Sequence, residues 1–312
     1  MEREVEELRE YFSAGKTREA SWRKQQLKGL LKFMKEREED ILKALKLDIG
    51  KHPVESFRDE VGALIKDINV ALDNLDNWMS GKKIKLPLAA YRTSAKLVAE
   101  PLGVVLIIAS WNFPFGLALE PLIGAIAAGC TAVIKPSELS PASSALLAKA
   151  IPAYVDPEAV KVIQGGIDVC GQLLLCKWDK IFFTGSSLVG RIVMAAAAKH
   201  LTPVVLELGG KCPCIVDSIS NSWLTEYAAD TVPFGGVGES GYGRYHGKFS
   251  FDTFTHEKPV LKRALFPDFW FRYPPWTNKK LELLRAAFAF KYFNVLLIVL
   301  GLKKPKKLPA NI

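Results

Sequence analysis

Glu207 is the residue of this chain that is best placed for acid–base chemistry. It follows the apolar run 203–206, which is typical of a strand covered on both faces. A lone carboxylate in such a place needs a partner or a raised pKa, and a raised pKa suits a general base near neutral pH. The alternative is a glutamate at a strand end, capped by the backbone amides of Gly209 and Gly210.

Asn112 is a second candidate, in the turn Trp-Asn-Phe-Pro at 111–114 that follows the apolar run 103–109. Its side-chain amide can donate a hydrogen bond to the oxyanion that forms on an attacked carbonyl. The alternative is an asparagine that only forms a turn before a helix. On composition alone, the turn is the better explanation.

Lys135 and Glu138 flank a Pro-Ser turn at the end of the apolar run 131–135. Both side chains can reach the hydroxyls of a ribose, and the carboxylate would repel a 2′-phosphate. A solvated ion pair would have the same spacing, so the spacing leaves both explanations open.

The segment 183–190 places small residues where a helix begins, Gly185, Ser186 and Gly190 among them. Free backbone amides at a helix start can hold a pyrophosphate. A serine N-cap without any ligand is the alternative.

The cysteines do not indicate a metal centre. Cys212 and Cys214 form a C-x-C pair, but no second pair and no histidine lies at a spacing that would complete a metal site. Cys130, Cys170 and Cys176 lie in apolar or turn segments and are expected to be structural. The odd total of five indicates reduced thiols in a cytoplasmic protein. We predict no metal site, and on the residues alone Cys212 and Cys214 could still be nucleophiles.

The formal charge of +9 comes from 42 Lys and Arg residues against 33 Asp and Glu residues. The basic residues are scattered, apart from a cluster at 303–307. The sequence has no zinc-finger spacing, no aromatic RNA-binding signature and no basic recognition helix, so a nucleic-acid partner is not expected. The acidic, polar start is unlike a signal or transit peptide.

Four motifs together resemble the aldehyde dehydrogenase family, and the chain is most similar to its class 3 branch, which includes fatty-aldehyde and plant-type enzymes. They are Trp-Asn-Phe-Pro at 111–114, Lys-Pro-Ser-Glu at 135–138, the octet 183–190 and Glu-Leu-Gly-Gly-Lys at 207–211. The resemblance implies that Asn112 supports an oxyanion and that Glu207 activates the water that hydrolyses a thioester. It implies an aldehyde substrate and the cofactor NAD, without excluding NADP. The residues implied to bind the cofactor are Trp111, Lys135, Glu138, Gly185, Ser186, Gly190, Leu208 and Gly209.

The resemblance covers 1–222 and resumes over about 231–302, where Tyr-His-Gly at 245–247 belongs to a family motif near the substrate funnel. Most of the family's second α/β domain, with its nucleophilic cysteine, should lie between these blocks and is missing. No cysteine of this chain has the sequence context of that nucleophile, so the resemblance implies that all five are non-catalytic. The resemblance implies NAD(P)-dependent oxidation of aliphatic or fatty aldehydes to carboxylic acids, but we expect this chain to be catalytically impaired. The alternative is a non-enzymatic truncated variant that binds NAD or pairs with a full-length subunit.

The elements that position these residues are expected to form an α/β fold with a doubly wound parallel sheet. Strands alternate with helices over 101–211, as in a Rossmann-like NAD-binding domain. A flavodoxin-like domain without a nucleotide is the alternative. Within 1–80, two amphipathic helices at 2–49 and a third at 55–78 should pack on that domain, with Gly50 ending the second. Residues 81–100 are expected to form a hairpin arm, which in the family supports a dimer. A solvated extension is the alternative. Residues 212–265 would be the remnant of the truncated catalytic domain.

The tail, 266–312, contains the most apolar run of the chain at 293–302. That run is too short to span a bilayer. The resemblance to fatty-aldehyde enzymes, which use hydrophobic tails in this way, implies an interfacial amphipathic anchor whose lysine cluster favours anionic lipid, at the endoplasmic reticulum or another membrane surface. A C-terminal helix packed on the body is the alternative.

Overall fold

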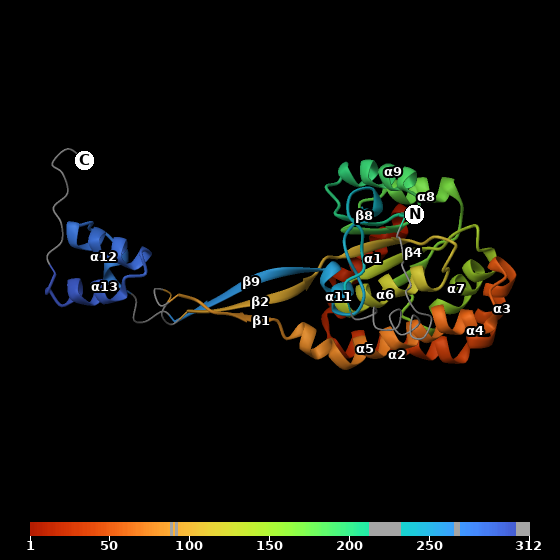
Figure 1. The fold of residues 1–312 in the computed structure, drawn as a ribbon, viewed down its shortest axis with the longest axis horizontal. Helices are drawn as coiled ribbons and strands as arrows, with labels where there is room; N and C mark the ends of the chain where they lie inside the picture. The colour runs from red at the N-terminus through yellow and green to blue at the C-terminus, as the bar shows by residue number, and fades with distance from the viewer. Residues whose placement is uncertain (88–89, 91–92, 212–231, 265–268, 304–312) are drawn as a thin grey trace, which may run out of the picture. The chain divides into compact units, whose positions relative to one another are not determined.

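The computed structural model describes residues 1–87, 90, 93–211, 232–264 and 269–303. The chain divides into two compact units (Figure 1). The larger unit comprises Met1–Ser80 and Ala99–Glu257, and the smaller unit comprises Gly81–Val98 and Lys258–Ile312. The finer domain boundaries expected from the sequence stay predictions.

The larger unit is built on one six-stranded sheet with the order β5-β4-β3-β6-β7-β8. The first five strands in this order pair in parallel, and β8 pairs antiparallel with β7. The doubly wound parallel sheet predicted from the sequence is therefore confirmed. The strands are β3 (Val104–Ile108), β4 (Thr131–Lys135), β5 (Val160–Val162), β6 (Lys180–Thr184), β7 (Val204–Glu207) and β8 (Gly241–Tyr242).

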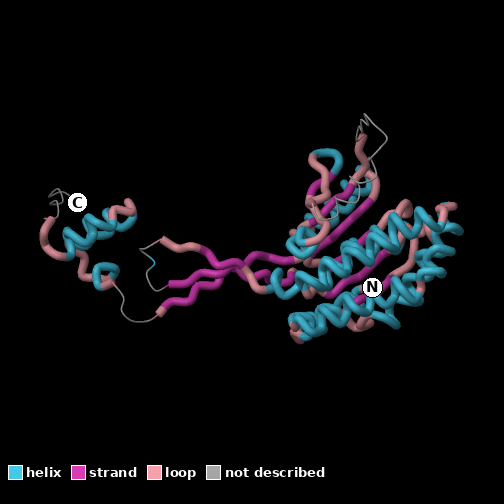
Figure 2. The backbone as a smooth tube through the Cα atoms, turned by 60° about the horizontal axis from the view of Figure 1, so that its bottom comes forward, coloured by secondary structure: helices cyan, strands magenta, loops and turns pink. Residues whose placement is uncertain are grey.

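Strand β3 lies at the centre of the sheet, and its side chains alternate between two hydrophobic clusters. Val105 and Ile107 belong to the cluster built by the N-terminal helices and α6 (Gly116–Ala128). Val104, Leu106 and Ile108 belong to the cluster that includes residues of α1 (Glu2–Ser13), α8 (Ile167–Leu175) and α9 (Ser187–Ala198). A strand buried on both faces needs this continuous apolar sequence, and Figure 2 shows helices packed along the strands.

The N-terminal helices differ in one place from the sequence prediction. The periodic apolar run that predicts one helix up to Ile49 forms two, α2 (Ala20–Glu36) and α3 (Glu38–Ile49), because the chain leaves helical geometry at Arg37, with φ −112° and ψ 18°. Leu27 and Leu45 are both fully buried, so the apolar spacing continues across the break and does not reveal it. Gly50 ends α3 with φ 67°, as predicted.

A short helix and a π-helical turn precede the third predicted helix. They are α4 (Pro53–Ser56) and Phe57–Val61, and α5 (Gly62–Met79) follows them. Between β4 and β5 the chain forms α7 (Pro141–Tyr154), and after β8 it forms α11 (Lys248–Thr253). Phe251 and Phe254 are buried in the core of the larger unit, so the second block of family resemblance, about 231–302, packs partly on the six-stranded sheet.

The smaller unit contains most of a three-stranded sheet and two helices. The sheet has the order β1-β2-β9, and Lys82–Ile84 of β1 pairs antiparallel with β2, as a hairpin arm requires. Its other elements are β2 (Thr93–Pro101), β9 (Thr255–Arg263), α12 (Asn278–Phe288) and α13 (Tyr292–Val299). None of the helices in the described ranges is long and apolar enough to cross a membrane.

Candidate cofactor and active site

The sequence candidates meet at one edge of the sheet. Lys135 and Glu207 are the last residues of β4 and β7, and Asn112 and Gly185 follow β3 and β6. Parallel strands bring their carboxyl ends to the same edge. The connection order also reverses between β3 and β6, which is the position where open α/β sheets bind ligands.

Lys135 and Glu138 form an ion pair at the end of β4. The Lys135 ammonium donates a 2.6 Å hydrogen bond to the Glu138 carboxylate. Lys135 is buried, whereas the Glu138 side chain is 40% exposed. Burial raises the pKa of Glu138, but the hydrogen bond from Lys135, a backbone hydrogen bond and the charge of Lys135 together outweigh it, and the net shift is downward. The ionised pair presents donors and acceptors that match a ribose diol.

The turn after β6 begins α9 with a side-chain cap. The hydroxyl of Ser186 accepts a 3.3 Å hydrogen bond from the amide of Val189, which is the N-cap alternative, and the first amides of the helix lie beside it. A Cβ on Gly185 would lie 2.5 Å from the ring of Phe183, and one on Gly190 would lie 2.9 Å from a methyl group of Leu208. Both glycines therefore permit close packing around a helix start that can take an anion.

Glu207 is buried, with 8% of its surface exposed. Its Oε1 atom has no hydrogen-bond partner among the described residues. Burial raises the pKa of Glu207 to about 7; His246 lowers it and Glu120 raises it further. A carboxylate with this pKa is divided between its two protonation states at neutral pH, as a general base requires.

His246 and Glu120 form an ion-pair contact that sequence reasoning did not assign. His246 Nε2 lies 2.9 Å from Glu120 Oε1, and each side chain is 16% exposed. The imidazole stacks on Phe234 with ring centroids 5.2 Å apart. The match of Tyr-His-Gly at 245–247 to the family motif was the available signal, but nothing in the sequence pairs its histidine with a residue of α6.

The segment after residue 231 lies beside Glu207, because its strand β8 pairs with β7. Gly241 lies opposite Glu207 in the antiparallel register. A Cβ on Gly241 would lie 1.8 Å from the carbonyl oxygen of Leu206, and its φ of 103° is in the left-handed region. Only glycine allows this approach, so the glycine-rich segment closes the sheet beside the candidate base.

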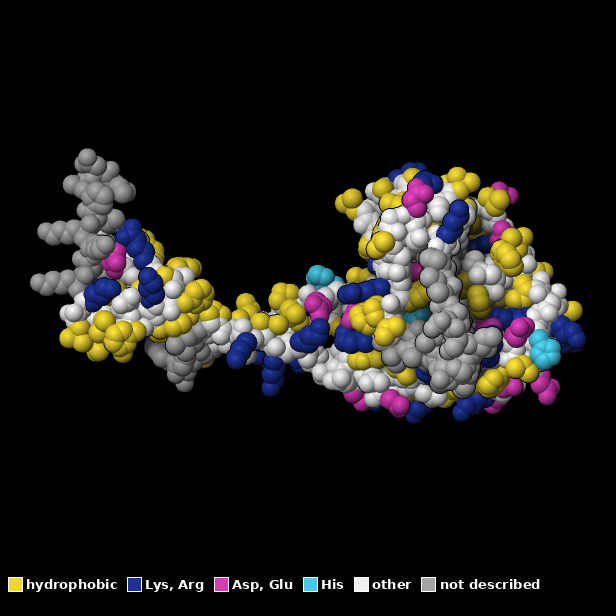
Figure 3. Space-filling model, in the orientation of Figure 1, with side chains coloured by type: hydrophobic (Ala, Val, Ile, Leu, Met, Phe, Trp, Pro, Cys, Tyr) yellow, Lys and Arg dark blue, Asp and Glu magenta, His cyan; other side chains and the backbone are white. Residues whose placement is uncertain are grey.

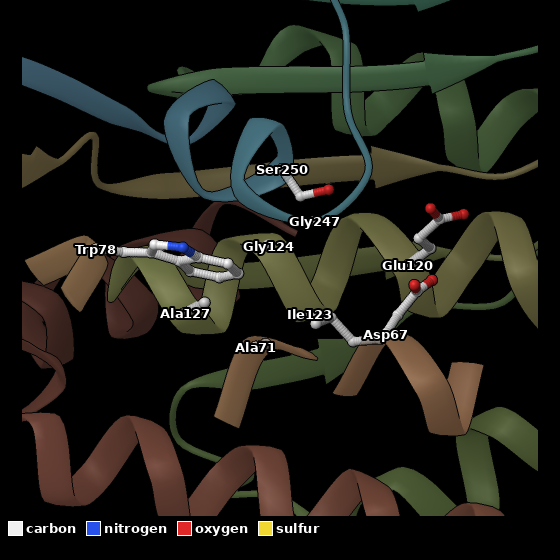
Figure 4. Close-up of a pocket in the computed structure, with 9 residues that line it drawn as sticks. All are labelled: Asp67, Ala71, Trp78, Glu120, Ile123, Gly124, Ala127, Gly247 and Ser250. Atoms are coloured by element: carbon white, nitrogen blue, oxygen red, sulfur yellow. The ribbon is translucent and has the colours of Figure 1, made fainter. Parts of the chain in front are cut away.

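A small cavity lies behind Glu120, between α5, α6 and the α11 region. Its volume is about 10 Å³, roughly the space that one water needs. Figure 4 shows the carboxyl groups of Asp67 and Glu120 close together at one end and Trp78 at the other. The cavity is too small for a substrate.

Asn112 is exposed, and its side chain is oriented by its neighbour. The hydroxyl of Ser110 donates a 2.6 Å hydrogen bond to Oδ1 of Asn112, which leaves the amide NH₂ group as the donor for an incoming oxygen. Trp111 beside it is 49% exposed. Leu208 is held by a 3.1 Å backbone hydrogen bond to Ser240, and Gly209 is exposed.

Glu60 fixes the helix that follows the Asn112 turn, and sequence reasoning missed it. Its carboxylate accepts hydrogen bonds from the amides of Phe115 and Gly116, at 2.9 and 3.2 Å. Lys51 donates to its other oxygen at 3.2 Å and lies 4.2 Å from the ring centre of Phe113. Burial raises the pKa of Glu60, and Lys51 opposes that shift.

The described cysteines are poor nucleophiles. Burial raises the pKa of the Cys130 thiol to about 11 and also raises the pKa values of Cys170 and Cys176. Reactivity requires the thiolate, so these three fit a structural role. Cys212 and Cys214 lie outside the described residues. Within the described ranges, no group of three or more His, Cys, Asp or Glu side chains could hold a metal ion.

The Lys135–Glu138 pair, the start of α9 and the buried Glu207 at strand ends of a doubly wound sheet fit an oxidoreductase that uses a dinucleotide cofactor. Residues 1–225 match the model of the aldehyde dehydrogenase family. The chain belongs to this family, and its relatives place it in the class 3 branch. Members of the family oxidise aldehydes with NAD(P).

Aldehyde dehydrogenase family 3 member F1 of Arabidopsis thaliana is 35% identical over 477 positions, which cover 97% of this chain and 99% of the relative. Subtracting the 312 residues of this chain from 477 leaves at least 165 positions of the relative without a counterpart. Family 3 member A2 of Macaca fascicularis is 47% identical over 70% of this chain, but only 45% of the relative is covered. The match to full-length relatives is therefore interrupted by a long gap.

Solved structures show the same likeness. The substrate-bound state of AldH from Staphylococcus aureus has a TM-score of 0.85 and 28% identity, with 92% of this chain and 99% of that chain covered. A point mutant of betaine aldehyde dehydrogenase from Staphylococcus aureus, in complex with NAD+, has a TM-score of 0.59 and 29% identity, with 67% and 43% covered. GapN from Methanocaldococcus jannaschii, complexed with NADP, has a TM-score of 0.59 and 27% identity, with 67% and 45% covered.

Proposed function

We propose that this chain binds NAD at the carboxyl edge of its sheet and has little or no aldehyde dehydrogenase activity. The observation that carries the proposal is the interrupted match, which leaves at least 165 positions of a full-length relative without a counterpart, 477 less 312. The Lys135–Glu138 pair, the start of α9 and Glu207 all lie in the part of the family sequence that this chain keeps. The segment where the family keeps its nucleophilic cysteine does not.

Two of the family's catalytic roles have residues here. The amide of Asn112 is oriented to donate to an oxyanion, and the carboxylate of Glu207 can take a proton from water. The nicotinamide, when bound, supplies the acceptor for a hydride. The nucleophile has no counterpart, and in a covalent mechanism its loss removes the route itself. For the full-length relatives' reaction, an aliphatic or fatty aldehyde is the substrate class that we propose.

Glu138 supports NAD over NADP. Its carboxylate is partly exposed and held ionised by Lys135. An ionised carboxylate accepts hydrogen bonds from ribose hydroxyls and repels a 2′-phosphate. Because Lys135 is buried and paired with Glu138, it does not stand ready to neutralise that phosphate.

The proposal is tested by incubating the purified chain with NAD and decanal while the absorbance of NADH is followed. The expected result is no NADH above the rate without protein, together with a rise in melting temperature when NAD is added. NADH formation that disappears in Cys212→Ala or Cys214→Ala would contradict the proposal, because it would show that a cysteine of this chain acts as nucleophile.

Pairing with a second subunit is an alternative function, and the hairpin of the smaller unit favours it. All three residues of β1 are exposed, and β1 is an edge strand of its sheet. An exposed edge can pair with another chain. Size measurement by light scattering should then show a homodimer, or a mixed dimer with a full-length class 3 subunit; a monomer under both conditions removes this alternative.

Membrane association through the tail is also a proposal. Phe293 and Leu302 are more than 70% exposed, and lysines follow them in the sequence. An apolar surface beside lysines suits an anionic lipid surface, such as that of the endoplasmic reticulum. Sedimentation with anionic vesicles should be lost when residues 284–312 are deleted, whereas unchanged sedimentation would refute the anchor.

A further inference from the structure

The two units carry formal charges of opposite sign. In the smaller unit, Gly81–Val98 and Lys258–Ile312, the sequence has 17 Lys and Arg residues and two carboxylates, Asp268 and Glu282, which gives +15, 17 less 2. The whole chain carries +9, so the larger unit carries −6, 9 less 15. Basic residues that are scattered in the sequence are therefore gathered in one unit. A charge asymmetry of this kind indicates an anionic partner for the basic part.

Part of this charge lies on the sheet β1-β2-β9. Residues 82–98 and 258–263, which we call the basic arm, include eight Lys and Arg residues and no carboxylate. The seven that the structure describes are exposed, and Figure 3 shows Lys and Arg side chains projecting from these strands. The next carboxylates along β2 and β9 belong to the larger unit. The seven are Lys82, Lys83, Lys85, Lys96, Lys258, Lys262 and Arg263.

Two lysines of the basic arm lie directly opposite each other. Lys83 of β1 pairs with Lys96 of β2 in the antiparallel register. Like charges in opposite positions destabilise a sheet, and neither side chain has an ion-pair partner among the described residues. Lysines on an edge strand prevent pairing with other chains, but Lys96 lies on the middle strand. The repulsion is therefore a cost that a bound anion relieves.

Exposed apolar side chains in the same unit favour a lipid surface over a nucleic acid. Trp270 and Trp276 are 53% and 63% exposed, and tryptophan is enriched at membrane–water interfaces. Leu261, beside Lys262 on β9, is 65% exposed. Apolar side chains gain from contact with the acyl boundary of a membrane, whereas non-specific binding to a nucleic acid depends on charge.

We propose that the basic arm contacts the anionic headgroups of a phospholipid membrane. The ammonium groups of Lys83, Lys85 and Lys96 bind the phosphate and carboxylate groups of lipids such as phosphatidylserine. Binding to a membrane surface increases with the apolar area buried and with the attraction to anionic lipid, so the basic arm adds charge to the apolar contact of the tail. The inference rests on the membrane association proposed above for the class of partner, but it assigns a different surface.

The test is sedimentation of the full chain with vesicles of phosphatidylcholine alone and with vesicles of phosphatidylcholine and phosphatidylserine in equal parts. The chain is expected to bind the anionic vesicles more tightly. The triple variant Lys83→Gln/Lys85→Gln/Lys96→Gln should bind them about a hundredfold more weakly, because each lysine near the surface contributes about fivefold. High salt should reduce the difference between the two proteins, since salt screens exposed charges.

A matched control separates the position of the lysines from the total charge. Lys28→Gln/Lys43→Gln/Lys46→Gln removes the same charge from exposed positions of the larger unit. This variant should bind the anionic vesicles as the unaltered chain does. Binding that is weakened equally in the control and in the arm variant would show that only net charge matters, which overturns the proposal.

Lys96→Glu shows that weaker binding does not come from unfolding. It places a negative charge opposite Lys83, so the melting temperature without lipid should not fall. Because the charge changes by two, binding to the anionic vesicles should weaken by about 25-fold. Unchanged binding by Lys96→Glu would contradict a headgroup contact at this position.

The outcomes distinguish the basic arm from the tail. Equal binding by the arm variant and the unaltered chain overturns the inference and leaves the tail anchor standing, whereas no binding to either kind of vesicle overturns both. Equal binding of the unaltered chain to the two kinds of vesicle overturns the anionic headgroup as partner. Tighter binding to a DNA duplex of random sequence than to the anionic vesicles, at the same salt concentration, overturns it in favour of nucleic acid.

Discussion

The backbone amide of Gly185 donates a 3.0 Å hydrogen bond to the carbonyl oxygen of Glu207. This bond joins the turn that we assign to the cofactor pyrophosphate to the candidate base. Because β6 and β7 are parallel and Thr184 lies opposite Glu207, the two functions occupy adjacent strand ends.

Replacing Glu207 by Gln should stabilise the chain at pH 8. The folded-state pKa of about 7 lies above the unfolded value of 4.5, so the stability that Glu207 contributes is fully present below pH 4.5 and is lost as the pH rises through 7. The substitution removes this loss, with a gain of about 1 to 3 kcal/mol.

Urea unfolding of Glu207→Gln and the unaltered chain at pH 5 and pH 8 measures the effect. The difference between the two proteins should grow with pH. Glu239→Gln is the control, because the Glu239 side chain is 86% exposed and should give no such trend. Equal pH dependence in Glu207→Gln and the unaltered chain would show that Glu207 is not the titrating group.

Substitutions at Ser186 should separate helix capping from cofactor binding. Ser186→Ala removes the acceptor for the Val189 amide and should cost about 1 kcal/mol of stability. Ser186→Asp keeps an acceptor at the N-cap, so its stability should stay near that of the unaltered chain. Its negative charge would repel a pyrophosphate, so the rise in melting temperature with NAD should disappear. If Asp at this position leaves the NAD effect intact, the pyrophosphate lies elsewhere.

Glu60→Ala should be among the most damaging single changes. The substitution leaves the backbone amides of Phe115 and Gly116 without their acceptor. It also removes the buried carboxylate that lies 3.2 Å from the Lys51 ammonium. The expected loss in the free energy of unfolding is of the order of 3 kcal/mol. Glu100→Ala, which breaks an ion pair with the half-exposed Arg18, should cost about 1 kcal/mol or less. Equal losses in urea unfolding would refute the role of Glu60.

Glu138→Gln should shift the cofactor preference toward NADP. The variant removes the charge that opposes a 2′-phosphate, and the ratio of the NADP and NAD dissociation constants should fall by about tenfold. Glu158→Gln changes an exposed carboxylate at the opposite end of the sheet, just before β5, and should leave the ratio unchanged. A ratio that is the same in Glu138→Gln as in the unaltered chain would place the ribose away from Glu138.

The sequence predicts the sheet well because strands buried on both faces require uninterrupted apolar runs. Residues 131–135 form β4 with the predicted bounds, and the motif residues at the strand ends meet because parallel strands end at one edge. The break at Arg37 was missed, since apolar spacing continues through it.

The partners of the site residues were harder to predict because they come from distant segments. Glu120 and His246 are separated by 126 positions, 246 less 120, and meet only through the return of the chain along β8. Glu60 precedes Phe115, the N-cap residue of α6, by 55 residues. Side-chain pairing over such distances depends on tertiary packing, which local sequence patterns do not encode.

Calorimetric titration of NAD into the unaltered chain and into Lys135→Gln tests the central claim most directly. One NAD per chain is expected for the unaltered protein, and binding about tenfold weaker for Lys135→Gln, which loses the charged donor at the end of β4. The melting temperature of the variant without NAD shows whether it is folded. No NAD binding by the unaltered chain, or equal binding by a folded Lys135→Gln, would contradict a cofactor site at this edge of the sheet.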